Sequence, residues 1–170
     1  PRPQTPEIRR NTNTTVLRVN LGPPDSPSVA DVRSHPRQFQ HDPRVVDLPR
    51  LVRKILVNLI IVPFRAPKSA EIYQKLWTEQ GSPIILHGER VHELLQERLG
   101  SDFTVELAMR YKNPSLPDVL ERVRQSNPDR IIVLPLFPQY ASASTGSALQ
   151  EVMDIIRNWW VIPNVDFISQ

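Results

Sequence analysis

The sequence predicts an α/β fold, a parallel four-stranded sheet with helices on both faces. Apolar runs that are too short for a helix alternate along the chain with longer stretches whose apolar residues recur at helical spacing. Crossovers between parallel strands are right-handed, so this alternation sandwiches the sheet between helices. A chain of 170 residues is long enough for one such domain.

The four strands are predicted at residues 15–20, 103–109, 131–134 and 165–168. The third, with the sequence IIVL, is typical of a strand buried on both faces of a parallel sheet. Arg18 is unusual in the first strand, because a central strand is normally apolar. We therefore expect its guanidinium to reach an edge of the sheet or a partner.

Capping residues and prolines predict the helix boundaries. Ser26 and Pro27 are typical of a helix start, and Pro36 predicts an early end, because the residue before a proline disfavours helical geometry. A loop of small and hydroxyl residues is predicted at 141–147, followed by a helix at 149–160. Three other helices are expected to start at Pro67, at Pro83 after the cap Ser82, and after the cap Ser115.

The stretch from Leu48 to Phe64 predicts an amphipathic helix with a basic side. Apolar residues recur at helical spacing, and basic or amide residues take the other face: Arg50, Arg53, Lys54 and Asn58. The simplest interpretation is a helix packed on its own domain. The alternative is a lip that rests on a membrane surface.

Composition excludes several classes of function. There is no cysteine, which excludes disulfides, thiolate zinc sites and a cysteine-ligated iron–sulfur cluster. The net charge is only +3 with interspersed signs, so no nucleic-acid partner is predicted. Residues 1–14 are polar and proline-rich and predict a disordered arm, and no apolar run has the length of a membrane span.

Loops that follow the first three strands should meet at one edge of the sheet, where open α/β sheets bind ligands. The first, LGPPDSP, lacks the glycines of a nucleotide-phosphate site. The others bring one fixed cation, Arg110, and three aromatic residues, Tyr111, Phe137 and Tyr140. These groups suit a large flat apolar ligand with a carboxylate, although Arg110 could instead belong to a structural ion pair. The four histidines predict no metal site, because their spacing does not bring them together.

Five motifs, in this order and at this spacing, resemble the N-terminal half of the ferrochelatase family, bacterial type: VNLGPPDSP, DPRVVDLP, FRAPKSAEIYQKLWTEQGSPI, AMRYKNP and LPLFPQYASASTGS. The resemblance implies a lyase that inserts ferrous iron (Fe2+) into protoporphyrin IX in haem biosynthesis, both being substrates. It also implies a fold of two similar Rossmann-like, chelatase-type halves. This chain, from residue 15 to 170, would be one half, and its partner the C-terminal half of the same enzyme.

The resemblance also implies a set of porphyrin-contacting residues and a place in the cell. The resemblance implies a protein of the cytoplasm. It also leads us to expect peripheral attachment to the inner membrane through residues 48–64. By motif, the contacting residues are Asn20, Leu21, Arg65, Tyr73, Ser82, Arg110, Tyr111, Phe137, Tyr140, Ser142 and Thr145.

The chain departs from the family pattern in two places. Ser34, His35, Pro36 and Gln40 replace residues that are usually aromatic or aliphatic, which predicts a shorter, more polar lip helix. The family's catalytic histidine and glutamate are expected beyond Gln170, so this chain alone is expected to be inactive. Two alternatives stay open: a non-catalytic porphyrin-binding or interaction module, and a flavodoxin-like nucleotide binder, which the missing glycines disfavour.

Overall fold

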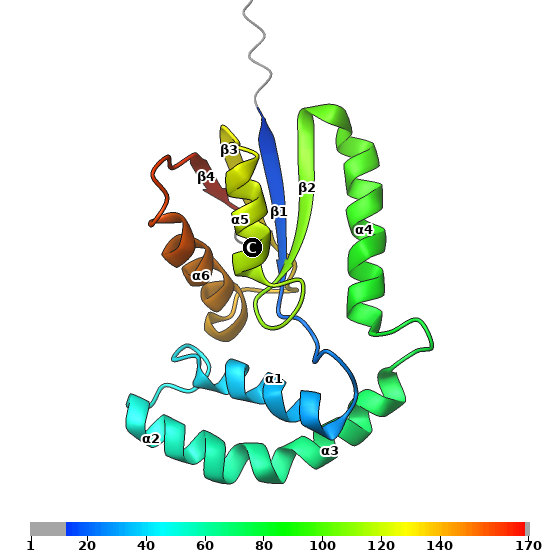
Figure 1. Cartoon of the computed structure of the whole chain (residues 1–170), viewed down its shortest axis with the longest axis vertical. Coiled ribbons are helices and arrows are strands. Elements are labelled where there is room, and N and C mark those ends of the chain that lie inside the picture. Colours follow the sequence, from blue (N-terminus) through cyan, green and yellow to red (C-terminus); the bar gives the residue numbers. More distant parts are fainter. Residues whose placement is uncertain (1–12, 169–170) are drawn as a thin grey trace, which may run out of the picture.

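The computed structural model describes residues 13–168 and contains one parallel sheet with the strand order β2-β1-β3-β4 (Figure 1). Its strands are β1 (Thr14–Asn20), β2 (Phe103–Met109), β3 (Arg130–Pro135) and β4 (Asn164–Phe167). All three strand pairs are parallel, so the carboxyl ends lie at one edge of the sheet. The predicted α/β class and all four strands are confirmed, each strand to within a residue or so at its ends.

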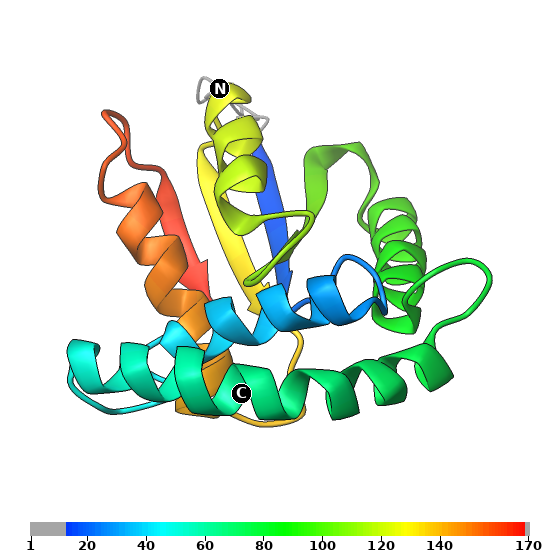
Figure 2. The same cartoon turned by 60° about the horizontal axis from the view of Figure 1, so that its bottom comes forward.

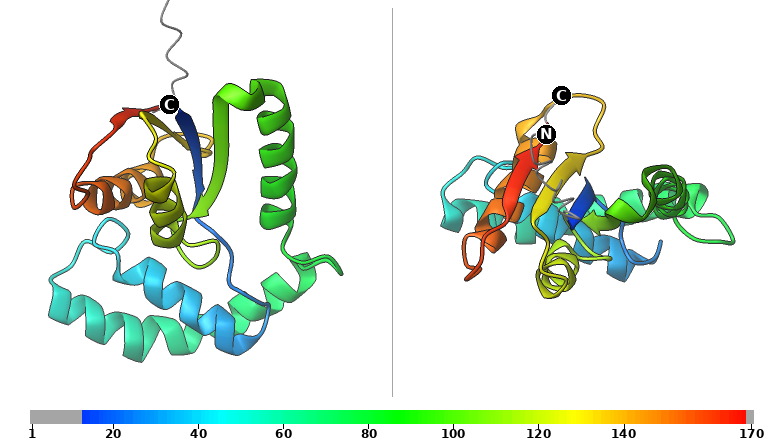
Figure 3. Two further views of the ribbon diagram at one scale, coloured as in Figure 1. Left: turned by 45° about the horizontal axis from the view of Figure 1, so that its top comes forward. Right: turned by 90° about the horizontal axis from the view of Figure 1, so that it is seen from above.

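Helices cover both faces of the sheet. One face packs against α5 (Leu116–Gln125) and α6 (Ser147–Ile156), which lie beside one another. On the other face α4 (Pro83–Leu99), continued by the short turn η2 (Gly100–Asp102), packs along β2 (Figure 3). The starts of α4 and α5 are as predicted, and the Ser115 hydroxyl accepts from the Asp118 amide as a cap.

The main core lies between the sheet and the pair α5 and α6. Strand residues Leu17, Val19 and Val133 are at most 1% exposed and pack there with apolar residues of both helices. Alternate residues of a strand point to opposite faces, so Arg18 points to the side of α4. All of β1 except its last residue is buried, which fits a central strand.

Arg18 is 2% exposed, and its Nη1 donates to the Gly88 carbonyl oxygen of α4 at 2.9 Å. The expectation that its guanidinium reaches a partner is confirmed. Its Nε is buried and has no hydrogen-bond partner within residues 13–168. Burial lowers the pKa of Arg18, so the charge costs free energy in this position.

A layer of helices lies across the carboxyl end of the sheet (Figures 1 and 2). We call it the helical layer; it consists of α1 (Val29–His41), α2 (Arg50–Ile55), the π-helical turn η1 (Leu56–Ile61) and α3 (Val62–Leu76). Within it α1 packs against α3. The chain enters the layer from β1 into α1 and leaves it from α3 into α4 (Figure 2).

Three predicted boundaries in the helical layer are wrong. The N-cap of α1 is Ser28, whose hydroxyl accepts from the Asp31 amide, and not Ser26. The helix runs through Pro36 to His41, so it is not shortened; the packing of α1 on α3 outweighs the missing backbone hydrogen bond. Pro67 lies inside α3 and does not start a helix.

In the long helix from Arg50 to Leu76, the large apolar side chains are mostly exposed, whereas a basic residue is buried. Val57, Val62, Ala66 and Ala70 face inward, together with Arg53, which is 8% exposed and donates to the Val46 carbonyl. The opposite side is an exposed apolar stripe, whose members are 50–74% exposed: Leu51, Val52, Ile55, Leu59, Ile60 and Phe64. The helix therefore does pack on its own domain, against α1, but most of the periodic apolar residues that predicted it lie on the side that faces away.

Two other predictions need correction. The loop expected at 141–147 contains a π-helical turn, η3 (Ser142–Gly146), and α6 spans Ser147–Ile156 instead of 149–160. Of the predicted arm, residues 1–12 lie outside the described residues, whereas Thr14 already belongs to β1. Within residues 13–168, no helix is both long and apolar enough to span a bilayer.

Replacing Arg18 tests whether its buried charge destabilises the fold. We expect Arg18→Met to raise the free energy of unfolding by about 1–2 kcal/mol, because a methionine fills a similar volume without a desolvated charge. Urea unfolding followed by circular dichroism measures this change. The matched control is Arg90→Met, which removes an exposed ion pair with Glu93 and should change stability by less than about 0.5 kcal/mol. A loss of stability in Arg18→Met would contradict the account.

Candidate functional site

The three strand ends meet as predicted, through backbone hydrogen bonds. The Arg110 amide donates to the Asn20 carbonyl at 2.7 Å, and the Tyr111 amide donates to the Leu21 carbonyl at 2.9 Å. After β3, the Leu136 amide donates to the Val19 carbonyl at 3.0 Å. The Asn20 side chain accepts from the Leu21 amide at 2.9 Å, so it shapes the turn after β1.

Gly22 allows this close approach. Its φ is +89°, and a Cβ at this position would lie 2.2 Å from the Tyr111 carbonyl oxygen. Any other residue would therefore be strained and would push the two loops apart. The single glycine of LGPPDSP thus joins the first two strand ends and does not serve a phosphate site.

A cavity of about 430 Å³, the interlayer cavity, lies between these strand ends and the helical layer. The loop after β1 supplies Leu21 and Gly22, while α4 supplies Ile84. The helical layer supplies the rest of the lining: His35, Phe39, Gln40, Arg65, Ser69 and Tyr73. Three of the predicted site residues, Leu21, Arg65 and Tyr73, are therefore brought together here.

The polar groups of the interlayer cavity are few. Within residues 13–168 the Arg65 guanidinium has no hydrogen-bond or ion-pair partner, so it is free to meet an anionic group. His35 Nε2 lies 3.0 Å from the Gly22 carbonyl oxygen and therefore carries the proton. Burial lowers the pKa of His35 and raises that of Tyr73, which favours the neutral form of both.

Aromatic rings of the helical layer form one wall of the cavity and contact Tyr111, which follows β2. The Tyr111 ring contacts His35 edge-on with centroids 6.4 Å apart, and Phe39 edge-on at 5.4 Å. His35 also meets Tyr73 edge-on at 6.5 Å. Edge-to-face pairs of this kind hold rings in fixed orientations, so the wall is preorganised.

Behind this wall lies a buried polar group, the Asp42 cluster: Asp42, Arg110, Tyr111 and Ser147. The Asp42 carboxylate accepts from Arg110 Nη2 at 3.0 Å, from the Tyr111 hydroxyl at 2.9 Å and from the Ser147 hydroxyl. Burial opposes its ionisation, but the hydrogen bonds from Ser147, from the Arg44 amide and from Tyr111 prevail, with the Arg110 charge adding to them, and hold its pKa below the ordinary value.

Arg110 forms ion pairs with Asp42 and with Glu151, whose carboxylate lies 3.3 Å from Nη2. Its guanidinium also lies 4.7 Å from the centre of the Tyr111 ring. The sequence left open whether Arg110 contacts a ligand or belongs to a structural ion pair. The structure contains the ion pair. Arg110 and Tyr111 line a neighbouring cavity of about 510 Å³, but the Tyr111 hydroxyl points into the cluster.

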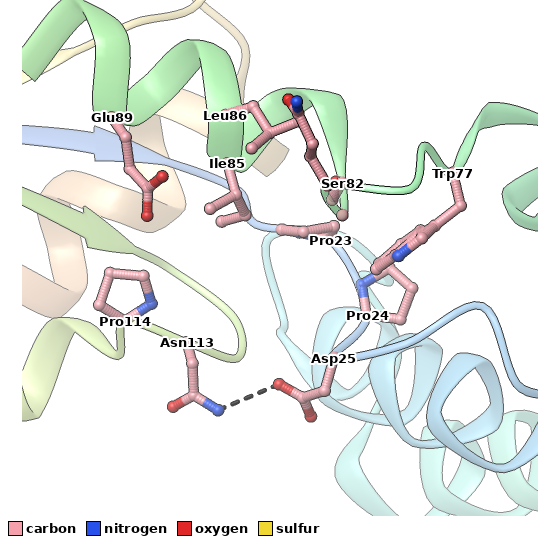
Figure 4. Close-up of a pocket in the computed structure, with 12 residues that line it drawn as sticks. Pro23, Pro24, Asp25, Trp77, Ser82, Ile85, Leu86, Glu89, Asn113 and Pro114 are labelled. Atoms are coloured by element: carbon pink, nitrogen blue, oxygen red, sulfur yellow. Dashed lines mark hydrogen bonds between the residues drawn. The ribbon is translucent and has the colours of Figure 1, made fainter.

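Ser82 lies apart from the interlayer cavity, in a second cavity of about 380 Å³ that we call the Trp77 cavity (Figure 4). Pro23, Pro24 and Trp77 surround Ser82 there, and Asn113 donates to Asp25 at 3.0 Å across its mouth (Figure 4). The loop after β1 separates the two cavities, since Leu21 and Gly22 line one, and Pro23 and Pro24 the other.

The remaining predicted residues follow β3. Phe137 is 9% exposed and packs with the main core, and it does not line the interlayer cavity. Thr145 is buried, and Ser142 lies 3.4 Å from an Arg44 nitrogen. Tyr140 is half exposed, and its hydroxyl lies beside Gly146, next to the Asp42 cluster.

Sequence reasoning missed several residues that shape the site, among them three of α1 and the residue that caps this helix. His35, Phe39 and Gln40 line the interlayer cavity, and Asp42 anchors the cluster behind it. A signal for the first three is the unusual stretch 34–40, but from the sequence it predicts only a shortened, more polar helix. Asp42 opens the motif DPRVVDLP, and nothing local shows that it meets residues 110 and 147. Within residues 13–168, no group of three metal-binding side chains is found.

The Tyr111 hydroxyl predicts a loss of stability at alkaline pH. Burial raises its pKa to about 12. Stability that depends on the neutral phenol is therefore complete below the unfolded value near 10 and falls as the pH rises to 12, by roughly 2–3 kcal/mol. Urea unfolding at pH 9 to 12 should show a steeper decline for the original chain than for Tyr111→Phe. Parallel declines would contradict this assignment.

Comparison with known proteins shows the family to which the chain belongs. The family model named Ferrochelatase matches residues 13–170. A protein named ferrochelatase from Coxiella burnetii (strain CbuK_Q154) is 48% identical over 145 residues, which is 85% of this chain and 41% of that protein. One from Legionella pneumophila (strain Corby) is 41% identical over 153 residues, 90% of this chain and 46% of that protein. The chain thus spans less than half the length of these curated relatives, and it belongs to the ferrochelatase family.

Proposed function

We propose that this chain forms one wall of the porphyrin cleft in an enzyme that inserts ferrous iron into protoporphyrin IX. The observation that carries the proposal is the interlayer cavity. It combines an aromatic and aliphatic lining with the guanidinium of Arg65, which has no partner in the part of the chain that the structure describes. A tetrapyrrole is a flat apolar ring with carboxylates on its edge. Leu21, Phe39 and Tyr73 suit the ring, and Arg65 suits a propionate.

The insertion step needs more than this wall. Two pyrrole protons must leave before a metal enters, so a base has to face the ring, and the ring must be bent to turn its lone pairs toward the metal. In the interlayer cavity the imidazole of His35 donates to Gly22 and is held neutral by burial. We infer that the base and the opposite wall belong to the C-terminal half of the enzyme.

Porphyrin binding tests the role of Arg65. We expect Arg65→Ala to weaken the binding of deuteroporphyrin IX by about tenfold, because a charge-assisted hydrogen bond to a propionate is lost. The affinity of Arg65→Lys should lie between those of the original chain and Arg65→Ala, since lysine keeps the charge but not the planar guanidinium. Titration of the Soret band gives the Kd. Lys68→Ala, one turn along α3 and outside the cavity lining, is the control; an equal loss there would contradict the role of Arg65.

A zinc-insertion assay distinguishes the proposed enzyme from an alternative without catalytic activity. The alternative is a non-catalytic porphyrin-binding or interaction module, which the engagement of Arg110 and Tyr111 with Asp42 favours. We expect no zinc insertion into deuteroporphyrin IX by this chain alone, and turnover when the C-terminal part of the Coxiella burnetii relative is added. Binding without turnover in the mixture would support the module. Turnover by the chain alone would overturn the inference about the base.

We further propose that the exposed apolar stripe rests on a membrane surface, peripherally. Exposed basic residues, Arg50 and Lys54, flank it, and this pairing of apolar and basic groups suits an anionic bilayer. The substrate and product are apolar enough to favour such a place. The proposal puts the enzyme in the cytoplasm, on the inner membrane. No iron–sulfur cluster is part of the proposal, because the sequence has no cysteine.

Vesicle sedimentation tests the stripe. The triple variant Ile55→Ser, Leu59→Ser and Ile60→Ser should lose most of its binding to vesicles that contain phosphatidylserine, because each substitution removes apolar area that would be buried in the bilayer. The control carries Val161→Ser and Ile162→Ser, in the exposed apolar loop between α6 and β4. Equal binding by the original chain and the triple variant would contradict the proposal.

A further inference from the structure

The width of the interlayer cavity depends on how the helical layer is held against the sheet. Two loop residues of the lining, Leu21 and Gly22, follow β1, whereas six come from α1 and α3. The two sides therefore belong to different layers of the molecule (Figures 1 and 2). A displacement of α1 and α3 relative to the strand ends would widen or close the space for a flat ligand.

The Asp42 cluster connects these layers. Asp42 is the C-cap of α1, while Arg110 and Tyr111 follow β2, and Ser147 starts α6. Three side-chain donors from the sheet side thus converge on one carboxylate of the helical layer, and the Arg44 amide holds its other oxygen at 2.8 Å. The Asp42 side chain is 5% exposed, so water competes little for these hydrogen bonds.

Tyr111 extends the cluster to the cavity. Its hydroxyl donates to Asp42, and its ring contacts His35 and Phe39, both of which line the cavity. Asp42 is not part of that lining. Its influence on a ligand is therefore indirect and passes through the placement of α1 and of the Tyr111 ring.

We propose that Asp42 is a positioning residue, which clamps the C-terminal end of α1 to the loops after β2 and β3 and so sets the spacing of the two walls of the interlayer cavity. The inference rests on the proposed function for the identity of the ligand. The clamp itself is a property of the fold and has its own readout. Without it, α1 stays attached through its packing on α3 and through the contact of His35 with Gly22.

The experiment measures wall spacing and porphyrin affinity in the same variants. The chain has no cysteine, so Lys68→Cys on α3 and Glu97→Cys on α4, both exposed, can carry two spin labels. Asp42→Asn keeps the size of the side chain but removes its charge. We expect the distance distribution between the labels to broaden or shift. The Kd for deuteroporphyrin IX should rise by about tenfold, because the ligand then has to order a wall that is no longer held in place.

The control is Asp154→Asn on α6, an exposed carboxylate paired with Arg157 at 3.4 Å, which should change neither readout. Ser147→Ala removes one donor and keeps the Asp42 charge. It should weaken porphyrin binding less than Asp42→Asn does, and it replaces Asp42→Asn in the experiment if that variant does not fold. An unchanged distance distribution in Asp42→Asn, with circular dichroism that shows a folded chain, would overturn the proposal. If the original chain does not bind porphyrin, the proposed function fails, whereas the distance measurement still decides on the clamp.

Discussion

The arrangement of the site depends on one buried carboxylate. Asp42 gathers hydrogen bonds from Arg110, Tyr111 and Ser147, which lie 68, 69 and 105 residues away in sequence. A buried charge is costly unless it is paired and fully hydrogen-bonded, so these donors and Asp42 require one another. The parallel sheet brings the donors together at its carboxyl edge, and the carboxylate fixes the helical layer over that edge.

Two features of the long helix from Arg50 to Leu76 depart from ordinary burial. A basic residue, Arg53, is buried in the helical layer, while the apolar stripe from Leu51 to Phe64 faces outward. Large exposed apolar patches usually mark surfaces that meet a partner. The helical layer therefore has two distinct sides, one that lines the interlayer cavity and one that exposes the apolar stripe.

Much of the sheet could be predicted from the sequence, because its signals are local. The aliphatic run of β3, the cap at Ser115 and the proline after Ser82 each specify an element from a few neighbouring residues. The helical layer could not be predicted in this way. Packing of α1 on α3 carries the helix through Pro36, and the periodic apolar residues of the long helix say nothing about which side is covered.

The candidate site likewise has some residues that the sequence predicts and others that depend on contacts between distant segments. Leu21, Arg65 and Tyr73 were predicted by resemblance and line one cavity, but Ser82 and Phe137 lie elsewhere. The role of Asp42 could not be predicted, because its partners are distant in sequence. For the same reason the sequence leaves two roles open for Arg110, a ligand contact and a structural ion pair, and the structure contains the ion pair.

The most direct measurement is an NMR titration of the 15N-labelled chain with deuteroporphyrin IX, whose ring current shifts nearby amides. The account predicts the largest shifts at Leu21, Gly22, His35 and Ser69. Shifts confined to the Trp77 cavity or to the exposed apolar stripe would contradict it.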